Sequence, residues 1–177
     1  MVVTLQQPYL KNIMESKSKS TSNNHIFFME QCIDLGKMAM LQGDAPVGSI
    51  IVKDNTVIGI GIEAGKSSQD ITKHAEIEAV NDALFKTKLK DLSGCTLYTT
   101  HEPCIMCSYV IRNYKLQTIV YGTNVEYVGG ITSDLKVMQT LQVPKWGKAP
   151  IIIGNVLKEE CEKLSTEYTT KHNNDEK

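Results

Sequence analysis

The spacing of apolar residues along the chain predicts helices that alternate with strands. Residues 25–40 have apolar side chains at every third or fourth position, which is the pattern of an amphipathic helix. Residues 47–62 are two β-branched runs separated by a polar turn, which is typical of a hairpin. The further expected elements are a helix over 74–85, a strand over 95–100, a helix over 102–114, strands over 118–122 and 151–154, and a helix over 156–168.

This order of elements predicts one mixed sheet with helices on both faces. The hairpin is antiparallel, whereas the later strands are joined by crossover helices and therefore run parallel. We expect an α/β fold, a three-layer α/β/α sandwich around a mixed five-stranded sheet. The length of 177 residues fits one such domain, which we place at residues 25–168. Residues 1–24 and 169–177 are polar and without period, so we expect them to be disordered tails.

The charge balance argues against a large polyanionic partner. The chain has 19 Lys and Arg against 20 Asp and Glu, which gives a formal net charge of −1. Arg112 is the only arginine, and arginine is the side chain that pairs best with phosphate. The last predicted helix carries charges of both signs rather than a basic stripe. The sequence therefore disfavours RNA as a partner.

The sequence also bears on membranes and on the cellular compartment. No segment has the roughly 18–20 consecutive apolar residues of a membrane span. The N-terminus lacks the basic start and apolar run of a secretory signal. Five cysteines are an odd number, and two of them form a C-x-x-C pair, which favours metal or redox chemistry in a reducing compartment over disulfide bonds. We therefore expect a cytoplasmic protein without membrane contacts.

Two short motifs carry the candidate chemistry, His74-Ala75-Glu76 and the pair Cys104 and Cys107. Each motif is predicted to open a helix, and helix N-termini gather at one edge of such a sheet. One histidine and two cysteines form the ligand set of a catalytic zinc site, because structural zinc sites are closed by four ligands. Zinc would lower the pKa of water to about 7. Glu76 can move the proton of that water only if His74 lies at the very start of the helix, because positions i and i+2 diverge on a regular helix.

Two other interpretations of the cysteines remain open. A C-x-x-C pair also occurs in redox proteins, where the histidine motif would have no role. Alternatively, Cys95 or Cys161 supplies a fourth ligand to a structural zinc site. Both of these cysteines fall on predicted apolar faces, which favours a place in the core.

Together the motifs resemble those of the cytidine/deoxycytidylate deaminase superfamily, whose signature is H-x-E followed by P-C-x-x-C. The resemblance extends over about residues 25–165 and favours the branch that holds bacterial guanine deaminase, fungal cytosine deaminase and tRNA adenosine deaminase. It implies that His74, Cys104 and Cys107 hold one Zn²⁺ per chain and that Glu76 is the catalytic proton shuttle. It also implies a homo-oligomer, in the simplest case a homodimer.

Residues near the motifs bear on the substrate. Relatives in this branch usually have Asn where this sequence has Glu63, and an ionised carboxylate only accepts hydrogen bonds, so Glu63 favours a base edge that is rich in N–H groups. The resemblance implies that the amide of Ala75 lines the pocket. We also expect His101 and Tyr127 to face the pocket. Trp146 either stacks over a bound purine or packs in the core.

The sequence therefore favours a zinc-dependent hydrolytic deaminase that acts on a free nucleobase or nucleoside and releases ammonia. Guanine-like substrates are favoured over cytosine-like ones. The alternative within the same chemistry is a tRNA adenosine-to-inosine deaminase. An alternative from another class is a catalytically silent deaminase-like partner subunit, although such subunits commonly lack the shuttle glutamate that is present here as Glu76. By the same resemblance we expect Glu102 to hold its loop rather than to contact substrate.

Overall fold

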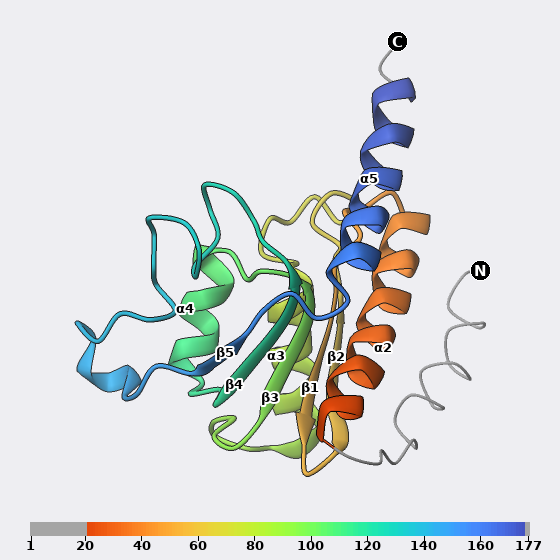
Figure 1. Ribbon diagram of the computed structural model, residues 1–177. Helices are drawn as coiled ribbons and strands as arrows, with labels where there is room; N and C mark the ends of the chain where they lie inside the picture. The colour runs from red at the N-terminus through yellow and green to blue at the C-terminus, as the bar shows by residue number, and fades with distance from the viewer. Residues whose placement is uncertain (1–20, 176–177) are drawn as a thin grey trace.

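The computed structural model describes residues 21–175, and Figure 1 shows one sheet between two layers of helices. The elements are α2 (Thr21–Leu41), β1 (Gly48–Lys53), β2 (Thr56–Ile62), α3 (Ala75–Thr87), β3 (Thr96–His101), α4 (Ile105–Asn113), β4 (Thr118–Thr123), the 3₁₀-helix η1 (Pro144–Trp146), β5 (Ile151–Ile153) and α5 (Lys158–Asp175). The strand order is β2-β1-β3-β4-β5. β1 is antiparallel to β2 and β3, whereas β3, β4 and β5 run parallel. The predicted three-layer α/β/α sandwich with a mixed five-stranded sheet is confirmed.

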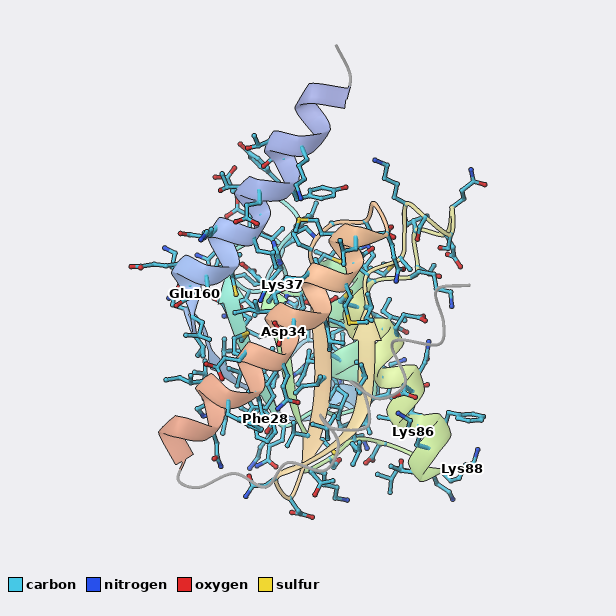
Figure 2. The ribbon with its side chains drawn as sticks, turned by 90° about the vertical axis from the view of Figure 1, so that its right-hand side faces the viewer. Phe28, Asp34, Lys37, Lys86, Lys88 and Glu160 are labelled. Carbon is cyan, nitrogen blue, oxygen red and sulfur yellow. The ribbon has the colours of Figure 1, made fainter. Side chains whose placement is uncertain are left out.

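Helices α3 and α4 cover one face of the sheet, and α2 and α5 cover the other (Figures 1 and 2). Each face has its own apolar cluster. On the first face, Ile51, Leu97 and Ile119 of the strands pack with Val80 of α3 and Ile111 of α4. The second cluster includes Phe28, Leu35, Ile50, Tyr98, Val120 and Leu164. Each large apolar side chain that is fully buried here contributes about 1.5–3 kcal/mol, so both layers are firmly attached to the sheet.

The terminal helices are longer than the sequence predicts. α2 begins at Thr21 and α5 continues to Asp175, so residues 21–24 and 169–175, which we expected to be tails, are helical. The last helix is fixed beyond the apolar core by a hydrogen bond from the Tyr168 hydroxyl to the carbonyl oxygen of Gly43 at 3.4 Å. Our expectation of disorder for residues 1–20 and 176–177 lies outside the described residues. Within residues 21–175, no helix is long and apolar enough to cross a membrane.

Gly61 allows α3 to approach the sheet closely. A Cβ atom at Gly61 would overlap the carbonyl oxygen of Ala75, and one at Gly59 would overlap that of Ala79. The alternation of glycine with isoleucine in β2 is therefore a packing requirement of the face that α3 covers. This close approach brings the first turn of α3 down onto the sheet, next to the start of α4.

Candidate metal and catalytic site

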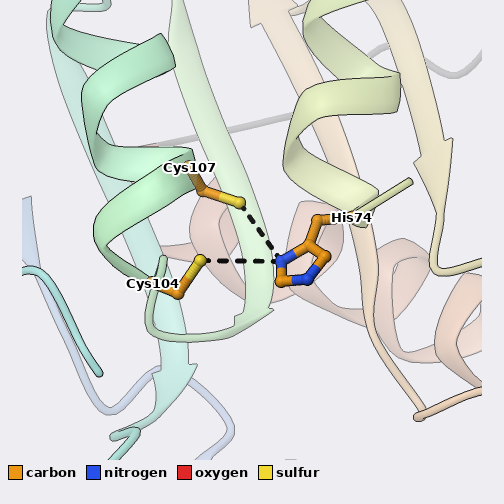
Figure 3. A group of neighbouring side chains, drawn as sticks. All are labelled: His74, Cys104 and Cys107. Atoms are coloured by element: carbon orange, nitrogen blue, oxygen red, sulfur yellow. Dashed lines mark hydrogen bonds between the residues drawn. The ribbon is translucent and has the colours of Figure 1, made fainter. Parts of the chain in front are cut away.

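Three metal-ligating side chains converge where α3 and α4 begin (Figure 3). His74 is the N-cap residue of α3, Cys104 is the N-cap residue of α4, and Cys107 lies in the first turn of α4. The Nδ1 atom of His74 lies 3.6 Å from the Sγ atom of Cys104 and 3.5 Å from that of Cys107. All three ligand atoms lie within 4.8 Å of one another.

These separations fit a tetrahedral zinc ion. An ion about 2.0 Å from nitrogen and about 2.3 Å from sulfur places the two ligand atoms roughly 3.5 Å apart at the tetrahedral angle. Cys95 and Cys161 do not belong to this group, and both are buried within the apolar clusters. Among the residues that the structure describes, the site therefore offers three protein ligands, which is the arrangement of catalytic rather than structural zinc.

His74 has extended backbone dihedrals, with φ −74° and ψ 144°, and the helix starts only at the next residue. This confirms the placement that the sequence argument required, because it lets His74 and Glu76 point to the same side. The Sγ atom of Cys107 lies within hydrogen-bond distance of Oε2 of Glu76, at 3.5 Å. A buried carboxylate therefore lies directly beside the three ligands.

Hydrogen bonds within the cluster prepare it for a metal. The pKa of Cys104 is lowered to about 4, because its sulfur accepts hydrogen bonds from Cys107 and from His74. The same contact with Cys104 raises the pKa of His74 to about 9. The hydrogen bond to the Cys104 thiolate and burial raise the pKa of Cys107. The metal-free cluster thus holds a thiolate beside an imidazolium, and metal binding releases the protons of the other two ligands.

Glu76 has the electrostatic setting of an acid–base group. It is 4% exposed, and burial raises the pKa of its carboxyl to about 7. A group that titrates near neutral pH exchanges protons with a reacting group most effectively. Perturbed carboxyls of this kind occur preferentially at functional sites.

Glu63 lies beside the cluster and contacts the main chain. Its Oε2 accepts the backbone N–H of Ala75 at 3.3 Å, and its Oε1 accepts that of Gly65 at 3.1 Å. Burial raises the pKa of this carboxyl, and the nearby charge of His74 opposes the rise. The Ala75 amide, which we expected to line the pocket, is used by Glu63.

The structure places His101 and Trp146 differently from our expectation of pocket residues, whereas the place of Tyr127 at the pocket stays a prediction. The imidazole of His101 lies against α5 instead, because its Nε2 atom is held 2.8 Å from the Ser165 hydroxyl and its Nδ1 atom 3.0 Å from the Thr100 hydroxyl. Trp146 is 7% exposed and packs edge-on against Tyr109, with ring centroids 5.5 Å apart, so the core interpretation holds. Tyr127 is 84% exposed, in the loop after β4.

Glu102 holds the loop after β4, as we expected from the sequence. Its carboxylate accepts the backbone N–H groups of Val125, Ile131 and Thr132 at 2.8–3.1 Å, and also the Thr132 hydroxyl at 2.6 Å. A Cβ atom at Gly129 would overlap the Glu102 carboxylate, which explains a glycine at this close approach. The loop is thereby closed over the start of α4.

Arg112 supports a second segment near α4. It is 2% exposed and donates hydrogen bonds to the carbonyl oxygens of Lys148, Thr140 and Gly147 at 2.7, 3.0 and 3.2 Å. The only arginine of the chain therefore has a structural role. Its three acceptors fix residues 140–148 against the second half of α4.

The same segment completes a basic hollow that sequence reasoning missed. Lys115, Lys145 and Lys148 line a depression of about 630 Å³. Lys115 follows α4, whereas the other two lysines flank Trp146 some 30 residues later, so no local pattern links them. The Nζ atom of Lys145 lies 5.9 Å from the ring centroid of Tyr109, which places this lysine beside the exposed side of α4.

Comparisons with known proteins agree with this geometry. The family model of the cytidine and deoxycytidylate deaminase zinc-binding region matches residues 22–123. A tRNA-specific adenosine deaminase of Aquifex aeolicus is 30% identical over 151 residues, which cover 84% of this chain and 95% of that protein.

Two solved structures show the same fold. One, from a study of A-to-I editing by tRNA:A34 deaminases, is 26% identical with a TM-score of 0.71, and the match covers 77% of this chain and 97% of that one. The other is a guanine deaminase of Nitrosomonas europaea, with a TM-score of 0.73 over 92% of this chain and 93% of that one. It is only 17% identical, so this likeness concerns the fold alone.

Proposed function

This chain belongs to the zinc-dependent cytidine and deoxycytidylate deaminase family, and from that membership we propose that it deaminates adenosine to inosine in tRNA. The observation that carries the proposal is the match to a tRNA-specific adenosine deaminase over 84% of this chain and 95% of the relative. This finding contradicts our expectation of a free nucleobase with guanine-like substrates first. It also reverses the expectation that RNA is disfavoured. That expectation relied on the net charge of the whole chain, which does not report a local basic surface.

In this proposal His74, Cys104 and Cys107 hold one zinc ion. Zinc bound there would act as a Lewis acid and would make hydroxide available at neutral pH. Attack at C6 of adenine replaces the exocyclic amine with oxygen, so that water is consumed and ammonia leaves. Glu76 takes up the proton that water loses and delivers it to the adjacent ring nitrogen and then to the leaving amine. Its buried carboxylate next to Cys107 supports this role and argues against a catalytically silent subunit.

The basic hollow supports RNA as the substrate. It lies beside the second half of α4, whereas the metal ligands lie at the start of the same helix. α4 has nine residues and rises only about 14 Å, at about 1.5 Å per residue. An anticodon arm that presents adenosine to the cluster therefore extends far enough to place phosphates near Lys145 and Lys148.

We further propose a cytoplasmic homodimer. The cysteines at positions 32, 95, 104, 107 and 161 are all free thiols, which supports a reducing compartment. Ile105 and Val128 are 37% and 47% exposed next to the metal ligand Cys104, and a second copy of the chain would cover them. Sedimentation equilibrium tests this assembly, and a monomer at micromolar concentration would contradict it.

The test of the function uses zinc-loaded full-length protein and an anticodon stem-loop with adenosine at the wobble position. Inosine is measured by mass spectrometry of the digested RNA. We expect conversion to inosine by the natural sequence and none by Glu76→Gln, which keeps the side-chain volume. A stem-loop with cytidine at that position, together with free adenosine, guanine and cytosine, serves as control. Ammonia release from a free base, with no inosine formed in the stem-loop, would overturn the proposal.

A further inference from the structure

Two buried hydroxyl groups form a chain of hydrogen bonds beneath Glu76. The Ser49 hydroxyl donates to Oγ1 of Thr99 at 2.8 Å, and the Thr99 hydroxyl donates to Oε1 of Glu76 at 3.3 Å. Ser49 and Thr99 are fully buried, and Glu76 is almost so. The chain therefore reaches the carboxylate from inside the protein, on the side away from the solvent.

The register of the sheet builds this arrangement. Ser49 of β1 and Thr99 of β3 are direct partners across the antiparallel pair, so their side chains point to the same face. On the other side of β1, the partner of Ser49 is Gly61, the residue that leaves room for the backbone of α3. The same register therefore places the two hydroxyls side by side. It also puts Gly61 beside them, so that the first turn of α3, which carries Glu76, packs closely against them.

The two hydrogen bonds have a defined direction. A hydroxyl group has one proton, and the donation from Ser49 occupies the oxygen of Thr99 while leaving the Thr99 proton for Glu76. Thr99 therefore holds Oε1, and the other carboxylate oxygen, Oε2, faces the Sγ atom of Cys107 at 3.5 Å. One oxygen is fixed from below, and the second is directed at the metal cluster.

We propose that Thr99 is a positioning residue that fixes the Glu76 carboxylate for proton transfer, and that Ser49 sets the direction of the Thr99 hydrogen bond. This inference rests on the proposed role of Glu76 as the proton shuttle. Two hydroxyls in the middle of a sheet are a poorer choice for packing than two aliphatic side chains, because buried polar groups are costly without partners. Their position opposite each other and under Glu76 gives this pair a function that packing alone does not supply.

The test compares Thr99→Val, which keeps the branched shape and removes the hydroxyl, with Thr99→Ser, which keeps the hydroxyl. A hydrogen bond to a charged group corresponds to roughly a 10- to 100-fold change in rate when it acts in the transition state. We therefore expect Thr99→Val to lower kcat on the adenosine stem-loop about 10- to 100-fold, with KM unchanged. Thr99→Ser should restore kcat to within about 3-fold of the natural sequence. Ser49→Ala should give a smaller loss, because Thr99 keeps its proton and loses only its fixed direction.

Two readouts are independent of activity. Thr99→Val should still bind one zinc per chain, but it should melt at a lower temperature than the natural protein, because the buried Ser49 hydroxyl and Oε1 of Glu76 lose their hydrogen-bond partner. In crystals of the zinc-free Thr99→Val protein the Glu76 carboxylate should turn away from Cys107, whereas in Thr99→Ser it should keep its place. An unchanged carboxylate in Thr99→Val, an unchanged kcat, or equal losses in the Val and Ser variants would overturn the inference. If the natural sequence does not convert the stem-loop, the proposed function fails, and the position of the carboxylate alone decides whether Thr99 holds it.

Discussion

The carboxylate of Glu63 accepts the backbone N–H of Ala75, which is the first residue of α3 and the neighbour of His74. Glu63 follows directly after β2, and its second oxygen binds the N–H of Gly65. The side chain therefore connects the end of the hairpin to the start of the helix that carries the histidine. Both of its oxygens face main-chain donors, which is the geometry of a residue that supports the site.

Replacement of Glu63 by Gln tests this support. An amide nitrogen in the place of one carboxylate oxygen meets an N–H group, so one of the two hydrogen bonds is lost. We expect a loss of about 1–3 kcal/mol in the free energy of unfolding, together with weaker zinc binding, measured by urea denaturation and by competition with a chelator. A contact with the substrate, as the sequence analysis expected for Glu63, predicts a different result. In that case the preference among stem-loops with adenosine, cytidine or guanosine at the wobble position changes while stability stays the same.

His101 makes the stability of the protein depend on pH. Burial lowers the pKa of its imidazole to about 4, against the usual 6.5. Between pH 6.5 and 4 the unfolded chain binds a proton that the folded protein does not bind, so the free energy of unfolding falls as the pH is lowered through this window. The full shift corresponds to about 3 kcal/mol. Urea denaturation from pH 7.5 to 4.5 should show a smaller slope for His101→Gln than for the natural sequence. Equal slopes would show that His101 is protonated in the folded protein.

The metal cluster could be predicted from the sequence, whereas the residues beneath it could not. His74 and Cys104 stand where the order of elements places the starts of two helices, and helix starts share one edge of the sheet. Thr99 and Ser49 meet only because of the register of β1 against β3, and no turn joins these two strands to fix that register in the sequence. His101 was misplaced for a related reason, because the partner of its imidazole is Ser165, which lies 64 residues later on α5.

The sequence disfavoured RNA for the same reason, because it does not show which distant residues the fold brings together. The sequence shows each lysine separately, and a net charge of −1 predicts no basic surface. Lys115 and Lys148 line the same hollow because the buried Arg112 binds three carbonyl oxygens of a distant loop. A buried arginine that pairs with the backbone looks the same in the sequence as an exposed one that pairs with phosphate.

Substitution of single cysteines should distinguish the zinc ligands from the cysteines of the core. Cys104→Ser removes the sulfur whose low pKa favours the thiolate, so we expect zinc to fall from one per chain to nearly none and deamination to be lost. Cys95→Ala, in the apolar core, should keep one zinc per chain despite some loss of stability. Metal content is measured by atomic emission after gel filtration. Retention of zinc by Cys104→Ser, or its loss from Cys95→Ala, would assign the ligands differently.

Neutralising the basic hollow should weaken RNA binding without affecting the chemistry. Each phosphate contact contributes about 0.7–0.9 to the slope of log affinity against log salt concentration, so the double variant with Lys145→Gln and Lys148→Gln should lower this slope by up to about 2. KM for the stem-loop should rise, while kcat stays unchanged because neither lysine touches the metal cluster. Lys37→Gln is the matched control, since Lys37 pairs with Asp34 on α2, on the opposite side of the sheet (Figure 2). An equal rise of KM in the control, or an unchanged salt slope in the double variant, would place the RNA contacts elsewhere on the protein.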